Sequence, residues 1–157
     1  MEVGGGVSRA EELRYLVLAA QREGNRLLAA RLRPLGLTTA QAEVLSLLNE
    51  RRVLTLSGLG ELLVCESGTN PSRLVDRLVT QGLVERARST TDGREVLLQL
   101  TSTGRRAAAQ VASVEAELYA SLEVLATRHD VDATIALLRD FIADLPSGHA
   151  IARRFPR

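Results

Sequence analysis

Short hydrogen-bonding side chains gather around position 70 of this 157-residue chain, and an arginine ends the group. The group comprises Ser67, Thr69, Asn70, Ser72 and Arg73. An asparagine amide can bond adenine at two atoms and an arginine fork can bond guanine at two, while hydroxyls suit phosphate oxygens. Arg77 follows Arg73 by four residues, which places both on one face of a helix. This chemistry favours contact with a nucleic acid.

A second basic group surrounds a polar loop, residues 89–93. Arg86, Arg88 and Arg94 flank that loop, and Asp92 is available to orient one of them. All 20 basic residues of the chain are arginines, whose planar forks match phosphate. Because 19 acidic residues leave a net charge of only +1, any contact with a nucleic acid must arise from local groups such as these.

The spacing of the apolar residues that follow predicts that the first group lies at the start of a helix. Leu74, Val75 and Leu78 recur at helical spacing, and Gly82 is a typical C-terminal stop. Ser67 or Thr69 is expected to cap this helix, with a proline tolerated in its first turn.

The second group is expected to lie on a β-hairpin. Residues 83–86 and 95–100 read as strands, and Asp92-Gly93 between them favours a tight turn. Upstream, residues 54–56 predict a short extended piece, followed by a helix capped by Ser57. Helix, turn, helix and hairpin is the order of a winged helix-turn-helix, whose second helix can lie in the DNA major groove.

Long helices are predicted on both sides of this unit. The fold class is therefore mainly α (α+β): a winged helix-turn-helix at about 35–101, with dimerisation helices at about 9–33 and 102–145. With 45% hydrophobic residues, the chain predicts a single globular domain over 9–145. Residues 1–8, with three consecutive glycines, are expected to be a flexible leader. Residues 146–157 are expected to be a solvated, arginine-rich tail, which could also contact phosphate or cover a partner subunit.

Three stretches resemble the MarR (multiple antibiotic resistance regulator) family of transcription factors. They are residues 35–45 (LGLTTAQAEVL), residues 72–86 (SRLVDRLVTQGLVER) and the wing segment from Asp92 to Thr101, with Gly104 beyond it. The resemblance covers about residues 9–145. It implies a homodimer built from the first and last helices, which binds a near-palindromic operator in double-stranded DNA. It also implies that Arg94 enters the minor groove, positioned by Asp92. Pro71 and Gly93 depart from the family's usual pattern, which has a β-branched residue and a second arginine there.

The resemblance also implies an effector pocket between the dimerising helices and the winged lobe. Arg14, Tyr15, Arg22 and Arg26 are candidates to line it, because arginine matches a carboxylate. The alternative is that these residues belong to the surface or the dimer interface. Cys65, in the turn before the second helix, is either a small buried hydrophobic residue or an oxidation sensor.

Other functional classes find little support. There is no nucleophile–base pair, paired carboxylates or phosphate loop, so we expect no enzyme and no cofactor. Two histidines and one cysteine predict no metal site, and no apolar run approaches the roughly 20 residues of a membrane span. The single cysteine fits a reducing cytoplasm. We therefore expect a sequence-specific DNA-binding transcriptional regulator, a homodimeric repressor that a small ligand or an oxidant releases from DNA. The alternative is a winged-helix protein-interaction module that does not read DNA.

Overall fold

The computed structural model describes residues 8–64 and 70–156, and its hydrophobic core lies around helix α2 (Thr39–Arg51). A capping box starts α2: the Thr38 hydroxyl accepts from the Gln41 backbone N–H, and the Gln41 side chain accepts from the Thr38 N–H. The side chains of Val44, Leu45 and Leu47 are fully buried in the core. The winged lobe is thus built around a central, well-capped helix.

Two short helices follow α2 in the winged lobe. Helix α3 (Leu56–Gly60) is capped by Thr55, whose hydroxyl accepts from the Gly58 N–H; the expected cap Ser57 instead lies within the helix. Helix α4 (Pro71–Thr80) ends as predicted, with Gly82 in the left-handed region at φ 70° and the Leu83 N–H donating to the Leu78 carbonyl.

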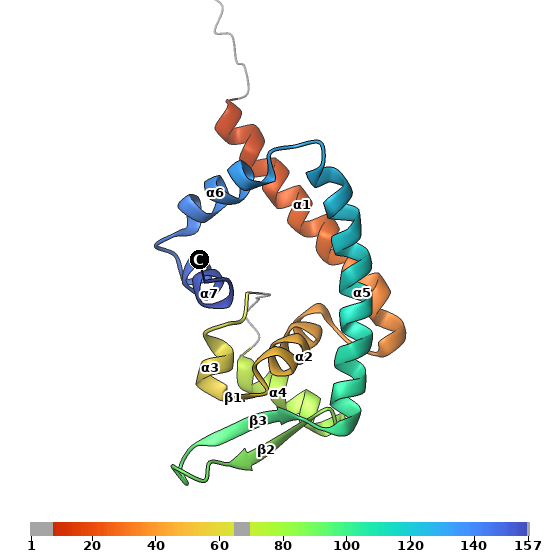
Figure 1. The fold of residues 1–157 in the computed structure, drawn as a ribbon, viewed down its shortest axis with the longest axis vertical. Helices are drawn as coiled ribbons and strands as arrows, with labels where there is room; N and C mark the ends of the chain where they lie inside the picture. Colours follow the sequence, from red (N-terminus) through yellow and green to blue (C-terminus); the bar gives the residue numbers. More distant parts are fainter. Residues whose placement is uncertain (1–7, 65–69, 157) are drawn as a thin grey trace, which may run out of the picture.

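A three-stranded antiparallel sheet completes this lobe. Strands β2 (Val84–Arg88) and β3 (Val96–Leu100) form the predicted hairpin, and β1 (Val53–Thr55) pairs with the other edge of β3. Leu98 and Leu100 turn into the core, which ties the base of the hairpin to the helices. Its tip projects from the lobe as a wing (Figure 1).

Three further helices extend away from the winged lobe. Helix α1 (Arg9–Leu32) is linked by a 3-10 turn, η1 (Arg33–Leu35), to α2, and it lies beside α5 (Ser102–Ala126). Helix α6 (Val131–Ile142) returns across the far end of α1, so the subunit has the outline of an open ring (Figure 1). The mainly α winged-helix class is confirmed.

The prediction of a C-terminal tail is wrong for residues 146–154, which form helix α7 (Pro146–Arg154). Pro146 occupies the first turn of α7, where a missing backbone N–H costs no ladder bond. Pro146 therefore lies just beyond the end of α6 and also starts α7. Gly148 permits α7 to pack closely on the end of α6, because a Cβ there would lie 1.8 Å from the Ile142 carbonyl oxygen.

Candidate nucleic-acid interface

Helix α4 has a buried face and an exposed face. Leu74, Val75 and Leu78 pack into the core, in agreement with the helical spacing of these residues. Arg73, Asp76, Arg77 and Thr80 are exposed on the opposite side. Two arginines on the outer face of the second helix can therefore reach a ligand outside the subunit.

The start of α4 contains side chains that cap the helix and that can also contact a ligand. The N-cap is Asn70 and not the expected Ser67 or Thr69, and the Asn70 side-chain oxygen accepts from the Ser72 backbone N–H at 2.8 Å. Asn70 is exposed and Ser72 is half-buried. The Asn70 oxygen thus serves the helix, which leaves its amide NH₂ as the group suited to an outside acceptor. Ser67 and Thr69, the other predicted contact residues here, lie outside the described residues.

Arg86 has a partner within the lobe. Its Nη2 lies 2.5 Å from the Asp76 carboxylate, so the pair joins strand β2 to the exposed face of α4. Both side chains keep much of their surface exposed, at 39% and 54%. Asp76 was not predicted as a site residue, because nothing local in the sequence indicates that it contacts Arg86. The pair holds the wing at a set position beside α4.

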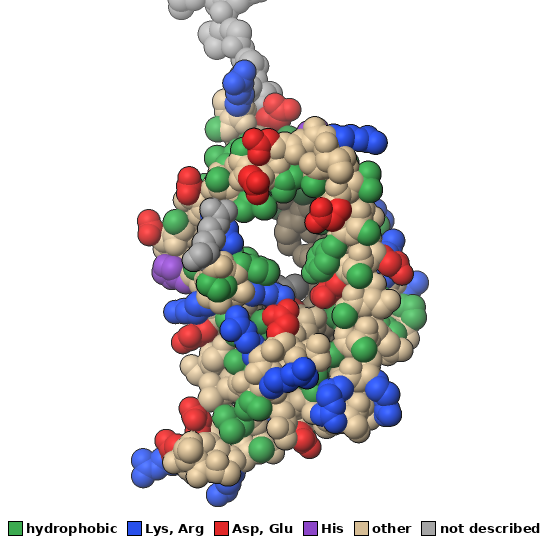
Figure 2. All heavy atoms as spheres, in the orientation of Figure 1, with side chains coloured by type: hydrophobic (Ala, Val, Ile, Leu, Met, Phe, Trp, Pro, Cys, Tyr) green, Lys and Arg blue, Asp and Glu red, His purple; other side chains and the backbone are tan. Residues whose placement is uncertain are grey.

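The wing loop is held by short hydrogen bonds of its own. Ser89, buried at 8% exposure, accepts from the Asp92 N–H at 3.2 Å, and the Ser89 N–H donates to the Glu95 carbonyl at 3.0 Å. The Asp92 carboxylate accepts from the backbone N–H of Arg94 at 3.0 Å, so it orients the chain at Arg94 rather than the guanidinium. Arg88 and Arg94 are exposed, and Figure 2 shows basic side chains at the end of the wing.

The four effector-pocket candidates lie on the exposed surface of α1 and do not form one site. The Arg14 guanidinium lies over the ring of Tyr15, 5.1 Å from its centroid, and Arg26 pairs with Glu23 at 2.7 Å. Arg22 is exposed. Arg14 alone of the four lines a cavity of about 360 Å³ between α1 and α6, whose walls are mostly apolar: Ala10, Leu13, Val17, Leu137, Leu138 and Phe141.

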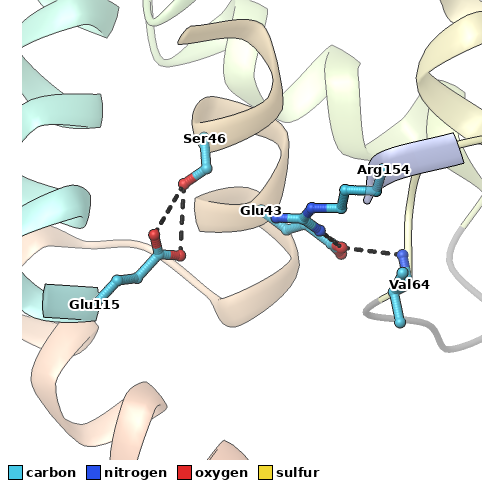
Figure 3. Close-up of polar contacts among 5 residues, drawn as sticks. All are labelled: Glu43, Ser46, Val64, Glu115 and Arg154. Atoms are coloured by element: carbon cyan, nitrogen blue, oxygen red, sulfur yellow. Dashed lines mark hydrogen bonds and ion pairs between the residues drawn. The ribbon is translucent and has the colours of Figure 1, made fainter. Parts of the chain in front are cut away.

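A buried polar cluster in the middle of the subunit was missed by the sequence analysis (Figure 3). Arg154 of α7 pairs with Glu43 of α2 at 2.7 Å, and the same Glu43 oxygen accepts from the Val64 N–H at 2.9 Å. Nearby, the Ser46 hydroxyl donates to Glu115, and burial raises the pKa of that carboxyl. Burial also raises the pKa of Tyr119, one turn further along α5. The amphipathic spacing of residues 146–154 is the sequence feature that could have predicted α7, which carries Arg154.

Cys65 lies outside the described residues, so the two interpretations of its thiol stay predictions. Over residues 8–64 and 70–156, no three His, Cys, Asp or Glu side chains are grouped so as to hold a metal ion. In the same part of the chain, every helix is too short or too polar to cross a membrane.

The exposed α4, its preceding helix and the arginine-bearing hairpin define a winged helix-turn-helix, a fold typical of DNA-binding proteins. The model of the MarR family matches residues 37–96. A crystal structure of the reduced form of MarR from Escherichia coli has 31% sequence identity and a TM-score of 0.66; the match covers 83% of this chain and 96% of that one. The chain belongs to the MarR family.

Two further relatives bear on function. The organic hydroperoxide resistance transcriptional regulator of Bacillus subtilis is 38% identical over 93 residues, which is 59% of this chain; the match spans only 63% of that relative's length. A mutant of Escherichia coli MarR, solved in a complex with operator DNA, is 31% identical with a TM-score of 0.60, and the match covers 74% of this chain and 92% of that one.

Proposed function

We propose that this protein is a cytoplasmic, homodimeric transcriptional repressor that binds a near-palindromic operator in double-stranded DNA. The observation that carries the proposal is the exposed face of α4, with Arg73 and Arg77, beside the wing arginines Arg88 and Arg94. In this geometry α4 enters the major groove and the wing follows the adjacent backbone or minor groove. The complex of a family member with operator DNA supports this assignment.

The dimer is supported by apolar surface that one subunit leaves uncovered. Helix α1 buries only Leu32, and α6 buries no residue, although both carry large apolar side chains. The exposed set on α1, the end of α5 and α6 includes Leu13, Leu16, Val17, Leu122, Leu125, Ile135, Leu137 and Phe141. A patch this extensive is typical of an interface. Two copies joined there would place two α4 helices about 10 base pairs apart, as a twofold operator requires.

Release by a small ligand or an oxidant completes the proposal. The apolar cavity beside Arg14 supports binding of a small, mostly aliphatic molecule, because its walls contain one cation and otherwise apolar carbon. An oxidant would act through the thiol of Cys65. Either event would release DNA by changing the spacing or the angle of the two winged lobes.

A band-shift titration with the DNA upstream of the protein's own gene tests the proposed function. We expect preference for that fragment over unrelated DNA, and a loss of about 1,000-fold in affinity between 50 and 200 mM salt as condensed counterions compete. Footprinting should then show a protected site with approximate twofold symmetry. A protein that binds every fragment equally weakly would instead fit a protein-interaction module.

A further inference from the structure

Helix α7 contacts the winged lobe at several points. Arg51 of α2 donates to the Arg153 carbonyl oxygen at 3.3 Å, and Arg153 Nε lies 3.7 Å from the carboxylate of Glu61, just after α3. Ala150 of α7 is buried at 5% exposure. The C-terminal helix is therefore docked on the same two helices that support α4.

The contact between Arg154 and Glu43 is the most enclosed of these. The Arg154 side chain is 15% exposed and that of Glu43 is 9% exposed, whereas Arg153 keeps 52% of its surface. Glu43 Oε1 accepts both from Arg154 Nη1 and from the backbone N–H of Val64 (Figure 3). One carboxylate oxygen thus joins α7 to the chain just ahead of α4.

Val64 is the last described residue before the segment 65–69, which leads to Asn70, the cap of α4. Removal of the Arg154 cation raises the free-energy cost of keeping the Glu43 charge buried, which favours states in which the carboxylate is more exposed to water. Undocking of α7 is therefore expected to loosen the contact between Glu43 and the Val64 N–H. Through Glu43 the C-terminal helix is thus connected to Val64, the residue from which the chain leads to the start of α4.

We propose that α7 is a clamp that positions α4 for DNA, with Arg154 as its positioning residue. The proposal rests on the proposed function, to which it adds a means of control. Any event that lifts α7 from the lobe lowers DNA affinity without removing a DNA contact. Arg154 acts through Glu43 and Val64 and contacts no DNA itself.

Two variants of the full-length protein that lose the same charge test the clamp. Arg154→Met removes the enclosed pair, and Arg153→Met removes a neighbouring exposed arginine of the same helix. We expect Arg154→Met to bind the upstream DNA roughly tenfold more weakly, because only a fraction of the molecules then holds α4 in place. Its salt slope should equal that of the wild type, since no phosphate contact is lost. Arg153→Met should bind like the wild type, because its 3.7 Å pair with Glu61 is exposed and contributes little, and the bond of Arg51 to its backbone carbonyl is kept.

Hydrogen exchange of the Val64 amide gives a second readout that does not depend on DNA. We expect exchange at Val64 to accelerate about tenfold in Arg154→Met, while the amide of Val75 in the core stays protected. Gly148→Ala, which changes no charge but forces α7 away from Ile142, should weaken DNA binding and expose Val64 in the same direction.

Equal DNA affinity for the Arg154 and Arg153 variants, or unchanged exchange at Val64, would overturn the clamp. A salt slope lower by about one in Arg154→Met would also overturn it, because Arg154 would then contact a phosphate. If the wild type showed no preference for its upstream DNA, the proposed function would fail, while exchange at Val64 would still decide whether α7 holds that residue.

Discussion

At the scale of residues, the arginines of the winged lobe differ in their surroundings. Arg86 is paired with Asp76, whereas Arg73, Arg88 and Arg94 are exposed. A cation already paired within the lobe has less to gain from a phosphate than one surrounded by water. Arg73 and Arg94 are therefore the side chains on which DNA binding should depend most, and Arg86 should act mainly by holding the wing to α4.

Substitution of Arg73 and of Arg94 should have different effects. Arg94→Ala should weaken binding to all sequences and lower the salt slope by about one, as expected for a phosphate or minor-groove contact. Arg73→Ala should reduce preference for the operator by about 1–3 kcal/mol, as expected for a lost base contact. Band shifts on operator and scrambled DNA would separate the two. Arg128→Ala, an exposed arginine in the α5–α6 loop, is the control; an equal effect there would contradict this placement.

Asn70 should affect both helix stability and DNA recognition. Asn70→Ala removes the cap of α4, at about 1 kcal/mol of unfolding free energy, and should also broaden sequence preference. Asn70→Ser can restore the cap but lacks the amide that pairs with adenine. Recovery of stability without recovery of specificity, measured by thermal melts and band shifts, would identify Asn70 as a base-contacting residue. Full recovery of both would limit it to capping.

Glu115 predicts a pH dependence of stability. Burial raises its pKa above the ordinary value of 4.5, opposed by the Ser46 hydrogen bond and by Arg154. The folded state therefore holds the proton more tightly, so this favourable contribution is complete below the ordinary pKa and is lost as pH rises through the raised pKa. Glu115→Gln should match the wild type in acid and melt at a higher temperature at neutral pH. Glu123→Gln, an exposed site on the same helix, should show no such divergence, and equal melting of Glu115→Gln at both pH values would contradict the prediction.

At the scale of elements, α4, the hairpin and α5 meet in a close backbone contact at residues 82–83, 101 and 104. The Thr101 hydroxyl caps α5 by accepting from the Gly104 N–H and also donates to the Gly82 carbonyl. The Thr101 N–H donates to the Leu83 carbonyl at 3.1 Å. Gly104 leaves room for that same carbonyl, so the start of α5 rests directly on the backbone that follows α4.

Gly104→Ala should therefore destabilise the fold. A Cβ at this position would lie 1.8 Å from the Leu83 carbonyl oxygen, and backbone on both sides must shift to admit it. We expect a loss of about 1–3 kcal/mol in unfolding free energy, measured by denaturant titration. Gly93→Ala in the wing loop, where a Cβ meets nothing within 4 Å, should change stability by less than about 0.5 kcal/mol. Similar values for both variants would contradict this account.

At the scale of the whole molecule, the core and the apolar surface lie in different parts of the chain. Buried residues concentrate in the winged lobe, whereas α1, the end of α5 and α6 expose their apolar side chains. Figure 2 shows these side chains along the upper part of the ring, around a hollow in the subunit. This exposed apolar surface is the one on which the proposed dimer would form.

Phe141 provides the sharpest test of this interface, because it is 76% exposed in the subunit. Phe141→Asp should convert the proposed dimer to a monomer by placing a charge in an apolar contact, and operator affinity should fall with it. Light scattering over a range of concentrations measures the change. Val96→Asp in the wing, at 42% exposure, should leave the mass unchanged; an unaltered mass for the Phe141 variant would place the interface elsewhere.

The sequence by itself determined the elements whose formation depends on near neighbours. The period of Leu74, Val75 and Leu78 defines the buried face of α4, Gly82 ends that helix, and Asp92-Gly93 lies in the turn of the wing. These features follow from helix period, left-handed φ and turn chemistry, which act over a few residues. The central match to the MarR family reflects the same local patterns.

The tertiary structure alone decided which distant residues meet. Arg154 and Glu43 are 111 positions apart, and no spacing within either helix indicates that they pair. The same holds for Arg86 with Asp76 and for β1 at the edge of β3. A side chain's partner depends on how whole helices pack, because burial removes the water that would otherwise satisfy its charge.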